Sequence, residues 1–228
     1  MSEINIHFEK ERATTYDQRF EKIAALKDVL HLTLQMVFQQ LPERSRVLVV
    51  GAGTGAELLY LAHHFPQWEF TAVEPSGDML EICRQKVTAA GYAERCEFHH
   101  GYTHQLPLGK SYDGATSLLV SHFLLDPAER VSFFEDIGER LRPGGTLFTA
   151  DLAQCGEEHD RVWEIWLRTI AYSGTEALQL EEYTQSLERG VSLVGAREMK
   201  ELLGTAGFQG ITHVLRTILI NAWFARRG

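Results

Sequence analysis

The segment from Val47 to Gly55 reads Val-Leu-Val-Val-Gly-Ala-Gly-Thr-Gly, an apolar strand that runs directly into a turn with three glycines. Glycine adopts positive φ readily and lets a ligand approach the backbone, because it has no Cβ. The helix expected after the turn offers its N-terminus to a ligand. Glu74 ends the next apolar segment, 19 residues after Gly55. This spacing predicts a nucleoside site in which Glu74 accepts hydrogen bonds from the ribose hydroxyls.

Strand-like and helix-like segments alternate up to about residue 150, which favours an α/β fold with a parallel sheet and helices on both faces. The apolar runs at 47–50 and 115–120 suit strands that are buried on both sides. Asp126 and Pro127 form an acidic N-cap followed by proline at the first helical position. We expect strands at 46–50, 68–73, 95–99, 113–120 and 146–150, and helices at 17–41, 55–65, 76–90 and from 127 to a tight turn at 142–145.

The pattern changes after residue 151. Residues 157–189 form a helical insertion rich in Glu and aromatic residues, and 196–206 form another helix. Two strand-like runs follow at 211–215 and 218–224, too close together for a helical crossover, so they should pair antiparallel. The fold class predicted is therefore a doubly wound, seven-stranded, mostly parallel sheet with an antiparallel last strand and a helical insertion after strand five.

The composition indicates an ordinary soluble globular protein, with 44% hydrophobic and 23% charged residues. No apolar run approaches the ~20 residues that cross a bilayer, and the first residues do not resemble a signal peptide. Three scattered cysteines indicate reduced thiols, so we expect a cytoplasmic protein. The net charge of −9 disfavours a nucleic-acid partner, which would need clustered basic residues.

The glycine turn fits two patterns. Gly51-x-Gly53-x-x-Ala56 is the dinucleotide fingerprint, whereas Gly51-x-Gly53-x-Gly55 resembles the first motif of class I S-adenosylmethionine-dependent methyltransferases. Four more features resemble these methyltransferases over nearly the whole chain. They are a helical segment before the first strand, the stretch 74–80 (Glu-Pro-Ser-Gly-Asp-Met-Leu), the late glycine motif 141–145 (Leu-Arg-Pro-Gly-Gly) and the closing antiparallel strand pair.

The resemblance implies the cofactor S-adenosyl-L-methionine, with S-adenosyl-L-homocysteine as product. The implied cofactor-binding residues are Tyr16, Gly51, Gly53, Gly55, Glu74, Pro75, Met79, Tyr102, Thr103 and Leu119. It also implies one domain over residues 1–228: an N-terminal helical lid (1–44), a cofactor-binding core (45–155), a helical insertion or lid (156–192), and the last helix and strand pair (193–228).

Individual roles follow from the same resemblance. Glu74 binds the ribose, Pro75 and Met79 pack against adenine, Leu119 faces the cofactor, and Tyr16 lies in the N-terminal lid. Many members carry an acid after the third strand that binds the adenine amino group. This chain has Gly101-Tyr102-Thr103 there, so the Tyr102 hydroxyl or a backbone group must replace the acid.

His122 and Asp151 are the candidate catalytic bases. Both follow the ends of predicted strands, at the carboxyl edge where ligands bind in such sheets. The sulfonium already activates the methyl group, so the protein must mainly align the reactants for in-line displacement. Neither adjacent pair, His63-His64 or His99-His100, comes with further ligands, so we expect no metal site.

The principal hypothesis is methyl transfer to a small-molecule acceptor. Residues from Leu124 onward also resemble carboxy-S-adenosylmethionine synthases, but Thr184 stands where that family has a carboxylate-binding arginine. A third hypothesis is a non-catalytic S-adenosylmethionine-binding protein, which the missing adenine-binding acid supports slightly. A nicotinamide dehydrogenase is the residual alternative. A homodimer would follow if the insertion exposes an apolar face.

Overall fold

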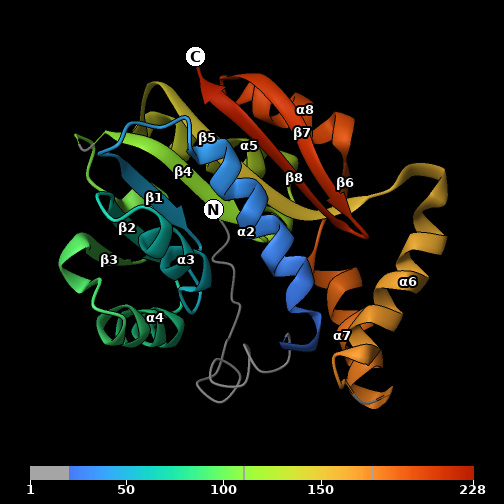
Figure 1. Cartoon of the computed structure of the whole chain (residues 1–228). Helices are drawn as coiled ribbons and strands as arrows, with labels where there is room; N and C mark the ends of the chain where they lie inside the picture. Colours follow the sequence, from blue (N-terminus) through green and yellow to red (C-terminus); the bar gives the residue numbers. More distant parts are fainter. Residues whose placement is uncertain (1–20, 110, 176) are drawn as a thin grey trace.

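The computed structural model describes residues 21–109, 111–175 and 177–228. One central sheet carries helices on both faces, and a pair of helices extends beyond one end of the sheet (Figure 1). The predicted lid residue Tyr16 lies outside the described residues.

The strands are β1 (Arg46–Val50), β2 (Glu69–Glu74), β3 (Cys96–His100), β4 (Tyr112–Leu118), β5 (Leu141–Gln154), β6 (Val194–Gly195), β7 (Phe208–Thr217) and β8 (Ile220–Arg227). The α-helices are α2 (Ala24–Phe38), α3 (Ala56–His64), α4 (Gly77–Ala89), α5 (Pro127–Arg140), α6 (His159–Tyr172), α7 (Ala177–Gly190) and α8 (Ala196–Thr205). Short 3-10 helices are η1 (Glu21–Ile23), η2 (Ala93–Arg95), η3 (Thr103–Gln105), η4 (Ser121–Phe123) and η5 (Gly156–Glu158).

The strand order is β3-β2-β1-β4-β5-β8-β7. The first five strands of the chain pair in parallel, β8 pairs antiparallel with β5, and β7 pairs antiparallel with β8. This confirms the predicted fold class, including the antiparallel last strand. The order reverses between β1 and β4, so their carboxyl ends flank the crevice where ligands bind in open α/β sheets.

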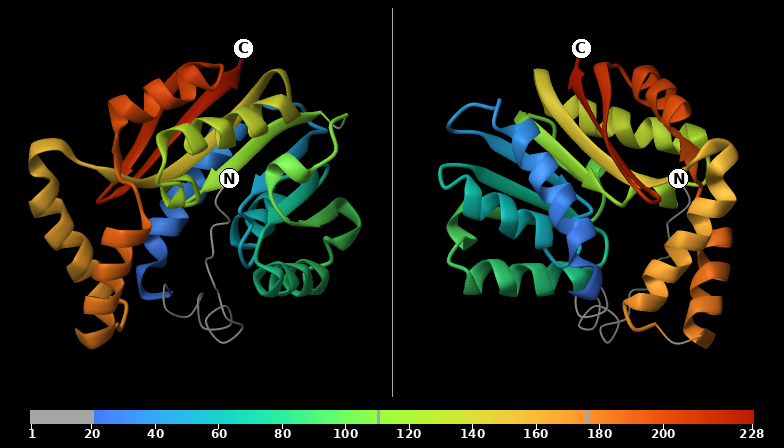
Figure 2. Two further views of the ribbon diagram at one scale, coloured as in Figure 1. Left: turned by 180° about the vertical axis from the view of Figure 1, so that it is seen from behind. Right: turned by 45° about the vertical axis from the view of Figure 1, so that its right-hand side comes forward.

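Two hydrophobic clusters hold the helices to the sheet. On one face, residues of α2, α3 and α4 pack on alternate residues of the strands, among them the fully buried Leu34 and Phe38. On the other face, α5 and α8 pack on the intervening residues (Figure 2). Burial of each Leu or Phe side chain contributes about 1.5–3 kcal/mol. Since helices cover both faces of the sheet, a ligand can reach the sheet only at the ends of the strands.

Local sequence signals fix the ends of two helices near this edge. The Ser76 hydroxyl accepts a hydrogen bond from the Met79 N–H and caps α4. The Asp126 carboxylate accepts one from the Ala128 N–H and caps α5, with Pro127 at the first helical position. Such caps satisfy N–H groups that have no partner within the helix.

The structure corrects three expected elements and adds one short strand. The N-terminal helix, expected over 17–41, is described as η1 and α2 and ends at Phe38. The insertion is two helices, α6 and α7, rather than one run. β5 begins at Leu141, and the expected turn at 142–145 is a bulge within it, between the pairs Tyr112–Leu141 and Gly114–Thr146. The two-residue β6 adds a short pairing on β5 that has no strong sequence signal.

None of the described helices is long and apolar enough to cross a membrane.

Candidate active site

The glycine turn bends sharply after β1 and is tied to the end of β2. The N–H groups of Gly51 and Ala52 both donate to the Val73 carbonyl, at 2.8 and 3.1 Å. Gly51, Gly53 and Gly55 all have positive φ, at 70°, 53° and 87°. Three left-handed residues in five would strain side-chain-bearing residues, so the local sequence dictates this path of the chain.

The three glycines meet different surroundings. A Cβ at Gly51 would collide with Val120, and a Cβ at Gly55 would lie 2.6 Å from the Cys83 sulfur. A Cβ at Gly53 would have no described heavy atom within 4 Å. Packing therefore requires glycine at 51 and 55, whereas Gly53 presents bare backbone to open space. That space suits the close approach of a ligand.

Glu74 binds the turn directly. Its Oε2 accepts the Gly53 N–H and its Oε1 accepts the Ser76 N–H, each at 2.9 Å. Burial raises the pKa of the Glu74 carboxyl, and the two backbone hydrogen bonds act in the opposite direction. Each carboxylate oxygen has a second lone pair, so both can still accept a hydroxyl. A ribose with two adjacent hydroxyls fits this arrangement, beside the open backbone of Gly53.

The residues expected around adenine lie at the ends of β2 and β3. Met79 is buried on the first turn of α4, and the Pro75 carbonyl contacts His100 Nε2 at 3.1 Å. The Tyr102 ring stacks on His104, with centroids 5.8 Å apart. Thr103 is buried, and its hydroxyl has no hydrogen-bond partner among the described residues.

Gln105 is a residue that the sequence reasoning missed. Its side-chain Oε1 accepts the Tyr102 N–H at 2.7 Å, so that backbone group is already used. Of the substitutes for the missing acid, the Tyr102 hydroxyl and other backbone groups therefore remain. The three-residue spacing from Tyr102 to Gln105 is a signal that could have found it, since a side chain there can reach back to the N–H of a cap residue.

Leu119 lies directly after β4 in a strained conformation. Its φ is 59°, which a branched side chain rarely adopts, and its N–H donates to the Ala150 carbonyl at 2.6 Å. Strain of this kind costs about 1–3 kcal/mol and clusters at functional sites. The conformation turns the chain away from the sheet at the edge beside the glycine turn.

His122 and Asp151 meet in a buried cluster. Asp151 Oδ1 contacts His122 Nδ1 and accepts the His122 N–H, each at 2.9 Å, while Oδ2 accepts the Ser121 hydroxyl at 2.5 Å. Asp151 is fully buried and His122 is 3% exposed. The structure thus brings the two candidate bases together, which their separation of 29 residues did not reveal. Both Asp151 oxygens hold the loop after β4, so Asp151 orients His122.

Comparison with known proteins now identifies the fold. Residues 47–145 match the methyltransferase domain family. The mitomycin 7-O-methyltransferase MmcR aligns with a TM-score of 0.70 at 17% identity, over 97% of this chain and 59% of its own. Human N-acetylserotonin methyltransferase, solved in complex with SAM, aligns with a TM-score of 0.68 at 16% identity, over 98% of this chain and 58% of its own. Residues 47–145 thus match a methyltransferase domain, and the chain has the fold of these solved methyltransferases. The resemblance drawn from the sequence to the S-adenosylmethionine-dependent superfamily is confirmed.

Two curated relatives match about half of this chain, which corresponds to a smaller part of their own length. The fatty-acid O-methyltransferase of Mycolicibacterium smegmatis is 34% identical over 48% of this chain. This chain spans only 38% of that relative and 28% of an uncharacterised Synechococcus protein that is 30% identical over 52% of this chain. The carboxy-S-adenosyl-L-methionine synthase of Campylobacter hominis is 21% identical, over 96% of this chain and 94% of the relative.

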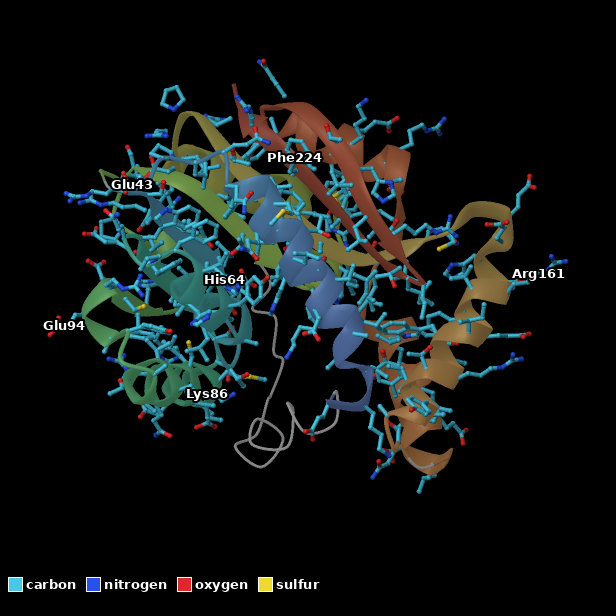
Figure 3. The ribbon with its side chains drawn as sticks, in the orientation of Figure 1. Glu43, His64, Lys86, Glu94, Arg161 and Phe224 are labelled. Atoms are coloured by element: carbon cyan, nitrogen blue, oxygen red, sulfur yellow. The ribbon has the colours of Figure 1, made fainter. Side chains whose placement is uncertain are left out.

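The helical segment after β5 forms a hairpin of α6 and α7. Trp166 Nε1 donates to the Tyr183 hydroxyl at 3.1 Å, and Trp166 and Ile170 are buried. Tyr172, at the end of α6, is 70% exposed. On the outer side, Arg161 points away from the rest of the molecule, as Glu94 does at the opposite end (Figure 3).

Three further polar residues of the site came only from the structure. They are Ser121 beside Asp151, Arg130 on α5 and Glu57 on the first turn of α3. Glu57 is buried next to β4, and burial raises its pKa to about 8. A helix-start glutamate is normally solvated, so its sequence position gave no sign of this environment. No group of three or more potential metal ligands occurs among the described residues.

Proposed function

We propose that the chain transfers the methyl group of S-adenosyl-L-methionine to a small-molecule acceptor by in-line displacement. The cofactor is S-adenosyl-L-methionine, as the methyltransferase family match and the structural relatives support. One observation carries the proposal: the Glu74 carboxylate holds the bare Gly53 backbone beside open space. When bound there, the cofactor supplies a methyl group activated by its sulfonium.

The residues of the chain bind and orient this donor. Glu74 accepts the ribose hydroxyls, and the backbone at 51–53 supports the methionine part. Pro75 and Met79 pack against adenine, with Tyr102 and Thr103 at its polar edge. The Thr103 hydroxyl is buried without a described partner and can satisfy one adenine nitrogen. Leu119 closes the site from the β4 side.

His122 is the proposed general base for acceptors that carry a proton. A hydrogen bond from Nδ1–H to Asp151 fixes the tautomer and leaves Nε2 as the proton acceptor. Asp151 then stabilises the imidazolium that forms. A general base of this kind contributes about 10²–10⁴-fold to the rate.

The α6–α7 hairpin is proposed as the lid over the acceptor. It extends beyond the carboxyl edge of the sheet, and η1 lies against α6 (Figures 1 and 2). The proposed partner is thus a small molecule enclosed between hairpin and sheet, with the exposed Ile165 and Tyr172 available to a second copy in a homodimer.

The test has two steps. Calorimetry with S-adenosylhomocysteine measures binding, and release of S-adenosylhomocysteine from the donor across a metabolite panel measures turnover. We expect saturable binding and turnover with at least one acceptor. Binding without turnover across O, N, S and C nucleophiles would favour a non-catalytic binding protein. Affinity for NADH and none for S-adenosylhomocysteine would overturn the proposal.

A carboxy-S-adenosylmethionine synthase is the second candidate, because the Campylobacter hominis synthase aligns over nearly its full length. Thr184 argues against it: this residue on α7 replaces the expected arginine, and its hydroxyl donates to the Leu180 carbonyl of its own helix. Intact-mass analysis separates the two activities. Methyl transfer adds one methyl group to the acceptor, whereas the synthase produces a carboxylated cofactor.

A further inference from the structure

Arg130 is a buried cation on the first turns of α5 that joins two segments far apart in the sequence. It is 1% exposed, and its Nη2 donates to the Leu124 carbonyl at 3.0 Å and to the Ser192 carbonyl at 2.9 Å. Leu124 belongs to the loop after β4, and Ser192 follows the α6–α7 hairpin. One guanidinium nitrogen therefore links the end of the hairpin to the loop that carries His122.

The same two segments are joined a second time through His122. The Ser192 N–H donates to the His122 carbonyl at 2.8 Å. His122 in turn gives its backbone N–H and its Nδ1 to Asp151 on β5. The hydrogen bonds thus run without interruption from Arg130, through Ser192 and His122, to Asp151.

Charge supports the same connection. Burial lowers the pKa of Arg130, while the negative charges of Asp151 and of Glu198 on α8 act to raise it. A buried carboxylate such as Asp151 is costly unless a positive charge or hydrogen bonds compensate it. Arg130 supplies that positive charge from α5, in addition to the hydrogen bonds that Asp151 receives from His122 and Ser121.

We propose that Arg130 is a positioning residue that fixes the end of the α6–α7 hairpin against the His122 loop and thereby orients the His122 imidazole. The proposal rests on the function proposed above. It makes the orientation of the base depend on the position of the hairpin, so that a displaced hairpin leaves His122 misaligned. Arg130 acts through His122 and needs no contact with the acceptor.

The test combines Arg130→Lys with a matched control on the same helix. Lysine keeps the charge, but its side chain is shorter and does not carry the ammonium to the position of Nη2, so the bridge between the Leu124 and Ser192 carbonyls is lost. Arg140, at the other end of α5, is also buried and donates to the Asp136 and Leu106 carbonyls. Arg140→Lys therefore reports the cost of changing a buried arginine far from His122.

We expect Arg130→Lys to lower kcat about tenfold or more, within the range that a general base contributes. The affinity for S-adenosylhomocysteine and the KM of the donor should change less than twofold. Arg140→Lys should leave kcat within twofold of the parent. In a His122→Ala background, Arg130→Lys should cause no further loss, because its effect passes through the missing imidazole. If Arg130→Lys lowered kcat by the same factor in the parent protein and in the His122→Ala variant, the proposal would be overturned.

A spectroscopic measurement decides the same question without turnover. In ¹⁵N NMR of the parent protein, His122 should be the neutral tautomer protonated at Nδ1, and Arg130→Lys should shift this signal while Arg140→Lys does not. An unchanged His122 signal in Arg130→Lys would refute the positioning role. If the parent protein shows neither binding nor turnover, the function proposed above fails, and this spectrum still decides the role of Arg130.

Discussion

Replacing Gly53 by alanine should separate cofactor binding from folding. Gly53 has φ 53°, and a Cβ there would meet no described atom within 4 Å. The fold therefore has room for the methyl group, and the cost to stability is only the left-handed backbone strain of about 1–2 kcal/mol. For a chain of this length each kcal/mol lowers Tm by about 2–4 °C, so a fall of about 2–8 °C is expected.

The same methyl group would occupy the space where the ligand approaches the backbone. We expect the Kd for S-adenosylhomocysteine, measured by calorimetry, to rise at least tenfold, which corresponds to about 1.4 kcal/mol. Gly91 is the matched control, because it also has positive φ, at 79°, and open surroundings, but it follows α4 away from the strand ends. Gly91→Ala should lose similar stability and bind normally. Equal binding by both variants would refute a cofactor contact at Gly53.

Three further predictions concern the acids and the base of the site. Glu74→Gln should weaken S-adenosylhomocysteine binding by about 10–150-fold in calorimetry, since a hydrogen bond to a charged group contributes about 1.5–3 kcal/mol. Glu69→Gln, at an exposed position on the same strand, is the control. Equal affinities of the two variants for S-adenosylhomocysteine would contradict the ribose contact of Glu74. Burial raises the pKa of Glu57 from 4.5 to about 8, so the folded state binds the Glu57 proton more tightly than the unfolded state does. As pH rises between these two values, the contribution of Glu57 to the free energy of unfolding therefore falls by up to about 1.4 kcal/mol per pH unit. Glu57→Gln should remove that slope in urea unfolding between pH 5 and 8; a difference from the parent that is constant with pH would disprove the shift. His122→Ala should lower kcat about 10²–10⁴-fold with unchanged cofactor affinity, and unchanged turnover would remove His122 as the base.

Local patterns predicted much of the fold. The strand–turn–helix unit at 46–64, the caps at Ser76 and Asp126 and the antiparallel β7–β8 pair each depend on residues close together in the sequence. The contact between the glycine turn and Glu74 was predictable for the same reason, because β1 and β2 are neighbours in both the sequence and the sheet. The break between α6 and α7 was missed, since their amphipathic patterns follow each other without a proline.

The polar interior of the site was beyond such reasoning. The contact of His122 with Asp151 spans 29 residues, and that of Arg130 with Ser192 spans 62. Both contacts depend on how β4, β5 and the hairpin pack together, which the sequence order of these elements does not determine. The burial of Glu57 arises in the same way, because only packing on β4 turns a helix-start acid into a buried one.

The most direct test is the crystal structure of the protein with S-adenosylhomocysteine. We expect both ribose hydroxyls to lie about 2.5–3.0 Å from the Glu74 oxygens, with the ligand against the Gly53 backbone. A ribose held elsewhere, or no ligand at millimolar concentration, would contradict the central claim.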